Sequence, residues 1–303
     1  MHDSPRPEQA ISSANYPATK ARLALLAAIL GSSLLAFGPW MVRLADVGPV
    51  ASGFWRLALA APLLLLIGRA AGQPIPRLPI ALWMTLAVGG FFFAADLAAW
   101  HSGIIRTRIA NATLFGNSSG FIFAIYGFLA MRAWPGRNQL VALLLAAIGV
   151  GLLLGRSYQL SPEHLFGDLL SLLAGLFYAF YLIALDRARD LVKPLPALTI
   201  STIAGVVPLL IFALAMGERV WPHDWTPLLV LAISSQVVGQ GLIVFSIGNL
   251  PPVAVGIALL WQPVVGSAIG WLAYGETFSS ADWIGAVAVG VALVLVRTPD
   301  RTR

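Results

Sequence analysis

The run PIALWMTLAVGGFFFAADLAAW, Pro79 to Trp100, is 22 residues long, and Asp96 is its only charged residue. About 20 mostly apolar residues are enough for a helix to cross the hydrocarbon core of a bilayer. The rest of the chain has the same character, since 58% of its 303 residues are hydrophobic, 11% are charged and the mean hydropathy is +0.83. Soluble proteins carry roughly 25% charged residues. This composition predicts an all-α, polytopic membrane protein.

Ten runs of this kind are predicted to span the membrane, and most turns between them are short and contain Pro, Gly or charge. The expected spans are 22–42, 50–68, 79–100, 109–131, 139–155, 166–185, 196–216, 226–248, 253–274 and 281–297. Residues 1–21 are polar and lack an apolar core, so we expect a disordered cytoplasmic tail rather than a signal peptide.

The distribution of Lys and Arg predicts the orientation, because cytoplasmic loops accumulate these residues. Thirteen of the nineteen lie in the N-terminal tail, the even-numbered turns and the C-terminus, five lie on the opposite side, and Arg56 lies inside a span. Both termini are therefore expected in the cytoplasm. Anionic lipid headgroups account for the pI near 10.2, so no nucleic-acid partner is expected. The chain has no cysteine, which excludes disulfides and thiolate metal sites.

An internal repeat is indicated by self-similarity at a shift of 145 residues, which lays residues 100–132 on residues 245–277. Gly103 then meets Gly248, and Asn117 meets Gln262. The pattern predicts five-helix repeats at 22–156 and 166–297, and an odd number of spans in each half gives the halves opposite orientations. Gly149, Gly151, Gly285 and Gly290 are expected to let helices approach closely.

The stretch LLWQPVVGSAIGWLAYGETFSSADWIGAVAVGVALVLV, Leu259 to Val296, resembles the last two helices of the drug/metabolite transporter superfamily, whose members carry a duplicated EamA domain. The positions that match are Pro263, Gly275-Glu276, Trp283-Ile284-Gly285 and Gly290-Val291, with Arg43, Pro49 and Arg56 in the first half. The resemblance covers nearly the whole chain after residue 22. It implies a multi-pass protein of the bacterial inner membrane that exports small metabolites, and the chain looks most like the amino-acid exporter branch, aromatic amino acids included.

Asp96 is the first candidate for contact with a substrate. A lipid-exposed carboxylate near the bilayer centre costs several kcal/mol, so Asp96 is expected to face the bundle interior. There it can bind the ammonium group of an amino acid, with Trp100 one turn further along the same face. It can equally pair with Arg56, Arg106 or a neighbouring span and serve only structure. Both interpretations stay open at this stage.

The other candidates are polar or aromatic residues inside predicted spans. His101 is expected near interfacial water, either as a proton-coupling group or as an ordinary interfacial residue. Polar residues of the fourth span either line a cavity or bond a neighbouring helix. Pro263 weakens the ninth span beside Trp261 and Gln262, which favours a cavity there. The candidate substrate-binding residues are Asp96, Trp100, His101, Asn111, Asn117, Ser118, Tyr178, Tyr181, Gln236, Gln240, Trp261 and Gln262.

The sequence argues against the main competing classes. A membrane enzyme is disfavoured because the four histidines are scattered and no catalytic cluster is evident. No P-loop occurs, so ATP is not expected to drive the protein, and neither a metal nor a cofactor is predicted. A channel is disfavoured as well, because the chain has neither the charged ring nor the repeated filter sequence that is usual in channels. We therefore expect an alternating-access exporter of amino acids, with export of other drugs or metabolites, such as cationic or nucleotide-like compounds, as the alternative. Facilitated export and proton exchange stay open, as do a monomer and a homodimer.

Overall fold

The computed structural model describes residues 18–107, 112, 115–131, 135–155, 162–274 and 280–296, and every regular element in these ranges is a helix. The elements are α1 (Ala18–Ala36), α2 (Gly38–Leu44), α3 (Pro49–Ala70), α4 (Ile80–Ile104), α6 (Ser118–Met131), α7 (Arg137–Gly155), α8 (Pro162–Ala188), α9 (Pro194–Ala215), α10 (Thr226–Val230), the π-helix η2 (Leu231–Gly239), α11 (Gln240–Ile247), α12 (Pro252–Leu259), α13 (Gln262–Tyr274) and α14 (Ser280–Leu295). The predicted all-α class is confirmed.

Six helical segments are long and apolar enough to cross a bilayer, namely Thr19–Leu44, Pro49–Ala70, Ile80–Ile104, His164–Ala188, Pro194–Ala215 and Thr226–Ile247. Four apolar helices are shorter: Ser118–Ala130, Arg137–Leu152, Pro252–Gly266 and Trp283–Leu295. The outer surface is apolar as well, since Ile80, Leu129 and Leu272 are each more than 70% exposed. Exposure of this kind suits lipid and not water. The chain is a multi-pass membrane protein, and the count of ten crossings stays a prediction.

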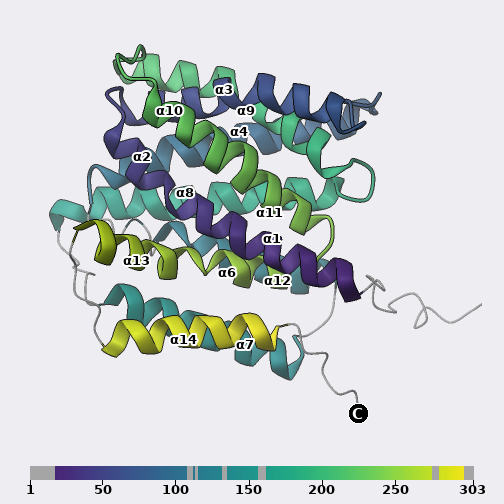
Figure 1. Ribbon diagram of the computed structural model, residues 1–303, viewed down its shortest axis with the longest axis vertical. Helices are drawn as coiled ribbons and strands as arrows, with labels where there is room; N and C mark the ends of the chain where they lie inside the picture. The colour runs from purple at the N-terminus through teal and green to yellow at the C-terminus, as the bar shows by residue number, and fades with distance from the viewer. Residues whose placement is uncertain are drawn as a thin grey trace, which may run out of the picture.

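The helices pack in pairs that combine the two halves of the chain. Helix α3 packs on α9, α6 on α12, and α7 on α14, while α4 packs on α8 and α1 on η2 and α11. Figure 1 shows α7 and α14 side by side at one edge of the bundle and α3 and α9 toward the opposite edge. Helices α3, α4, α8, α9, η2 and α11 bury most of the polar side chains described below.

Close helix contacts depend on some glycines and not on others. A methyl group on Gly149 would lie 2.7 Å from the carbonyl oxygen of Gly285, so α7 and α14 need glycine at that point. The expectation of close contact is wrong for Gly151 and Gly290, because a methyl group on either meets no atom of the described residues within 4 Å. Gly151 is also exposed, so its backbone faces away from a partner helix.

The turns at residues 45–48 and 216–225 meet at one end of the bundle, which we call the Glu218 end. Glu218 accepts a hydrogen bond from the backbone N–H of Ala51 (2.8 Å), in the first turn of α3, where backbone donors have no partner within the helix. The indole of Trp55 donates to the carbonyl of Val220 (2.6 Å). Asp46 accepts from the backbone N–H of His223 (2.8 Å) and lies 3.5 Å from Arg219. These contacts tie the start of α3 to the turn before α10.

A second set of contacts joins three helices at the opposite end, which we call the Arg189 end. The guanidinium of Arg189 lies 2.9 Å from Asp186 and donates to the carbonyls of Ile247 and Leu250, at the turn between α11 and α12. Tyr126 of α6 donates its hydroxyl hydrogen bond to Asp186 (3.1 Å). The end of α8 is therefore linked to both α6 and α11.

Candidate functional site

Arg56 of α3 is a buried cation, 3% exposed, inside the helix bundle. Its Nε donates to Oε1 of Gln236 on η2 (3.1 Å), and Nε2 of Gln236 donates to Oγ1 of Thr202 on α9 (3.0 Å). Gln236 therefore has both its oxygen and its nitrogen engaged, which fixes the orientation of its amide. The terminal nitrogens of Arg56 make no hydrogen bond to any residue that the structure describes.

The position of Gln236 depends on the local π-helix. The backbone N–H of Gln240 donates to the carbonyl of Ser235, five residues earlier, where an α-helix would use the residue four earlier. Such widened turns are rare and often occur at functional sites. Both Gln236 and Gln240 are fully buried, as is Ser235. These two candidate residues, Gln236 and Gln240, thus face the protein interior and not lipid.

Aromatic residues of α4 and α8 lie beside Arg56. Its Cζ is 5.5 Å from the ring centre of Phe93, which stacks on Tyr181 at 4.6 Å with an interplanar angle of 19°. A cation over an aromatic face gains electrostatic energy from the ring. Tyr178 donates its hydroxyl hydrogen bond to Oε1 of Gln240 (3.0 Å), and Nε2 of Gln240 is buried without a partner among the described residues.

Asp96 lies one helical turn after Phe93, and its side chain is half-buried. The structure gives it no ion pair within 4.0 Å in the described part of the chain, although it is close enough to Arg56 for the two charges to interact. Its hydrogen-bond capacity is likewise unused by those residues. A direct structural ion pair between Asp96 and Arg56, one of the two interpretations of the sequence, is not formed.

His101 is fully buried, so the expectation that it reaches interfacial water is wrong. Its Nδ1 is 2.7 Å from the carbonyl of Pro49 and 3.2 Å from the hydroxyl of Ser52, at the first turn of α3. Since that carbonyl can only accept, Nδ1 carries a hydrogen and donates it. The physical reason for the burial is that α4 continues to Ile104, and the start of α3, where Gly53 carries no side chain, packs directly over the imidazole ring.

The remaining candidates from the first half of the chain lie away from Arg56, at the contact of α4 with α6 and α8. Trp100 is half-buried, and its indole approaches Gly116. Asn117 is buried at the start of α6, and Ser118 packs against Gly175 of α8. Asn111 lies outside the described residues. Trp100, Asn117 and Ser118 thus gather where α4, α6 and α8 meet, and not around Gln236.

Trp261 and Gln262 lie at the break between α12 and α13, and both are half-buried. The break falls at Leu260 and Trp261, within three residues of Pro263, as the loss of a backbone donor predicts. The indole of Trp261 donates to the hydroxyl of Ser33 on α1 (3.2 Å). This contact connects the break to α1, so these two residues form a third group.

Sequence reasoning left Arg56, Thr202 and Phe93 out of the site. Arg56 entered only as a structural partner for Asp96, although a basic residue inside a span is itself a signal of function. Thr202 carries no such signal, because threonine is common in membrane helices. Phe93 cannot be told from a packing residue by sequence, since its neighbours Phe91 and Phe92 have the same side chain.

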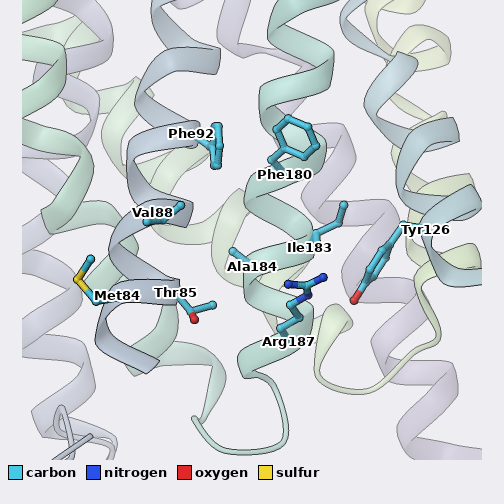
Figure 2. A pocket seen from close by; sticks show the side chains of 9 residues that line it. All are labelled: Met84, Thr85, Val88, Phe92, Tyr126, Phe180, Ile183, Ala184 and Arg187. Atoms are coloured by element: carbon cyan, nitrogen blue, oxygen red, sulfur yellow. The ribbon is translucent and has the colours of Figure 1, made fainter. Parts of the chain in front are cut away.

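A groove of about 590 Å³ opens between α4, α6 and α8, toward the Arg189 end. It is lined by Met84, Thr85, Val88, Phe92, Tyr126, Phe180, Ile183, Ala184 and Arg187. Figure 2 shows Phe92 and Phe180 at one end of this groove, with Thr85 and Arg187 toward the other. Along α4, Val88, Phe92, Asp96 and Trp100 follow at intervals of four residues and therefore share one face of the helix. The groove thus lies on the same face of α4 as Asp96.

The model of the EamA-like transporter family matches this chain twice, at residues 21–155 and 165–298. The threonine/homoserine exporter RhtA of Escherichia coli strain K12 is 28% identical over 237 residues, which cover 71% of this chain and 80% of the exporter. The exporter of the same name from Salmonella typhimurium strain SL1344 is 26% identical over 253 residues, with 75% and 86% covered. A chloroplastic WAT1-related protein of Arabidopsis thaliana is 24% identical over 292 residues, with 90% and 69% covered.

A solved crystal structure has the same fold, with a TM-score of 0.77 over 93% of this chain and 98% of the other, at 18% identity. The two family matches together cover most of the chain. The helices, the apolar outer surface and the paired packing fit this assignment. The chain therefore belongs to the EamA-like transporter family, within the drug/metabolite transporter superfamily.

Proposed function

We propose that this protein exports amino acids across the bacterial inner membrane by alternating access. The observation that carries the proposal is the pair of charged side chains inside the bundle, Arg56 and Asp96, which are near each other but form no ion pair. Unpaired charges inside a membrane protein are expensive and are found mainly at substrate or ion pathways. Support also comes from relatives whose names give threonine and homoserine as exported compounds.

In this proposal the two halves form inverted repeats that rock around the site. In the predicted repeat α1 corresponds to α8, and α4 corresponds to η2 with α11. The contact of α4 with α8 therefore has its counterpart in the contact of α1 with η2 and α11. The pairs α3–α9, α6–α12 and α7–α14 each join two corresponding helices. An inverted repeat predicts this pattern of packing. The contacts at the Glu218 end and the Arg189 end are the ones that would open in turn.

The groove in Figure 2 is the proposed entrance from the cytoplasm. Phe92 closes its inner end, and Asp96 lies one turn beyond, about 6 Å along the helix axis. Arg187, in the last turn of α8, lies at its outer part and would attract the carboxylate of an arriving amino acid. Trp100, His101, Asn111, Asn117, Ser118, Tyr178, Tyr181, Gln236, Gln240, Trp261 and Gln262 remain proposed to line or support the path.

Transport by the purified protein in liposomes tests the proposal. We expect uptake of threonine, homoserine or phenylalanine from a panel that also contains an organic cation and a nucleotide. The panel is run with and without a pH gradient, which separates proton exchange from facilitated export. Transport of the cation or the nucleotide without any amino acid would contradict the proposal and favour another metabolite class.

A further inference from the structure

Arg56 is held in a way that leaves its carboxylate-binding edge unused. Only Nε is engaged, by Gln236, and the Gln236 amide is itself fixed by Thr202. The terminal nitrogens have no partner among the described residues. The planar guanidinium binds carboxylates through two parallel hydrogen bonds, so this edge is oriented before any ligand arrives. A buried guanidinium with one neutral contact is costly, and an anionic ligand would offset that cost.

Asp96 is the complementary group. When ionised it can only accept hydrogen bonds, and the described part of the chain donates none to it. The side chain is half-buried on the α4 face that continues into the groove. An ammonium group with three donors fits this environment.

The separation of the two charges suits a ligand that carries both opposite charges close together. Arg56 lies over the ring of Phe93 with its Cζ 5.5 Å from the ring centre, and Asp96 lies one turn further along the helix. The two are therefore near, but not within the 4.0 Å of an ion pair. A free α-amino acid bears its ammonium and carboxylate on the same carbon, so it can bridge two side chains that do not reach each other.

The surrounding groups support the same ligand. Nε2 of Gln240, on the next turn of helix from Gln236, is a buried donor without a partner among the described residues. Its Oε1 is occupied by the hydroxyl of Tyr178, which turns the amide so that the nitrogen is the free end. A buried, unpaired donor beside the Arg56 site is suited to a second contact with a carboxylate.

We propose that Arg56 and Asp96 form a clamp for the main-chain carboxylate and ammonium of a free α-amino acid, so that the carrier selects its substrates by these two groups. This inference rests on the proposed amino-acid export, and it adds that amines without a carboxylate and acids without an ammonium are poor substrates. The side chain of the substrate then lies outside the clamp and is selected separately.

Competition on the wild-type protein tests the clamp without any substitution. L-threonine, threoninamide and N-acetyl-L-threonine compete with labelled L-threonine in proteoliposomes, and the same series is run with L-phenylalanine. A hydrogen bond to a charged group contributes more to binding than one between neutral groups. Loss of either charge should therefore weaken competition about tenfold or more. If both analogues compete as strongly as the free amino acid does, the clamp is wrong, although amino-acid export still stands. Uptake of neither labelled amino acid overturns both proposals.

Variants assign the two ends. Arg56→Gln should reduce threonine transport about tenfold or more and leave the weak transport of threoninamide within about twofold, because the amide has no charge to lose. Asp96→Asn should show the reverse selectivity, with N-acetyl-L-threonine unaffected. Arg43→Gln and Asp190→Asn, which remove exposed charges of the same kind, are the matched controls. Arg56→Lys keeps the charge and should restore part of the transport. Equal loss for all substrates in a variant of unchanged thermal stability overturns the assignment.

Discussion

Nε of Arg56 lies 3.1 Å from Oε1 of Gln236, although the two residues are 180 positions apart and belong to different halves of the chain. The contact joins α3 to the π-helix and leaves the outer edge of the guanidinium without a partner among the described residues. Arg56 and Asp96 therefore stay near each other as separate charges. A carrier that binds zwitterions needs this arrangement, because an internal ion pair would compete with the substrate.

Gln236→Glu should reduce amino-acid transport about tenfold or more while the protein keeps its thermal stability. The new carboxylate lies against Nε of Arg56 and neutralises the cation within the protein, so the substrate carboxylate loses its partner. Transport kinetics in liposomes and a melting curve measure the two effects. Ser234→Ala, at an exposed position of the same π-helix, is the control. Wild-type transport in the Gln236→Glu variant would show that Arg56 does not bind substrate.

The membrane fold follows from hydrophobic runs, because in lipid each backbone group must be paired within a helix. Pro263 also predicted the break between α12 and α13. The arrangement of the site could not be predicted in this way. The sequence offers Arg56, 40 residues from Asp96, only as one of several possible ion-pair partners, and nothing in it predicts the π-helix that holds Gln236. His101 was misplaced because its depth was judged from the expected end of one span, whereas the burial comes from the start of α3.

Gly149→Ala should lower the thermal stability, whereas Gly151→Ala should leave it unchanged or raise it slightly. A methyl group at Gly149 meets the Gly285 carbonyl oxygen at 2.7 Å, and overpacking of this kind costs about 1–3 kcal/mol. At Gly151 nothing in the described structure lies within 4 Å, and alanine favours the helix by about 0.5–1 kcal/mol. Melting curves in one detergent compare the pair. Equal melting temperatures would show that α7 and α14 are not in close contact at Gly149.

Asp46→Asn should remove an acid-dependent part of the stability at the Glu218 end. The backbone N–H of His223 and, after it, the Arg219 guanidinium hold the pKa of the Asp46 carboxyl below its ordinary 3.8. A lowered pKa means that the contribution is complete above about pH 3.8 and is lost as the pH falls through the folded-state value. The wild-type advantage in melting temperature should therefore be constant from pH 7 to 5 and shrink toward pH 2.5. An advantage that does not change with pH would contradict this assignment.

The orientation can be tested at the C-terminus. A reporter that is active only in the cytoplasm, fused after Arg303, should be active, because thirteen basic residues against five predict that this side is cytoplasmic. The same reporter inserted in the turn at residues 216–225 should be silent. The reverse pattern would show that the protein has the opposite orientation, with the groove on the outer side of the membrane.

Thr85→Cys should be labelled by a small, membrane-impermeant thiol reagent from the cytoplasmic side only. The chain has no cysteine, so a single introduced thiol gives an unambiguous signal. Thr85 lines the groove near Arg187, where we propose that the substrate enters, and water in that groove would admit the reagent and solvate the reactive thiolate. Ile203→Cys, at a position 41% exposed on the outer face of α9, is the control, because lipid there should exclude the reagent. Threonine or phenylalanine should slow the labelling of Thr85→Cys in proportion to its occupancy of the path. Labelling that is as slow as at Ile203→Cys would mean that lipid fills the groove, and the entrance would have to lie elsewhere.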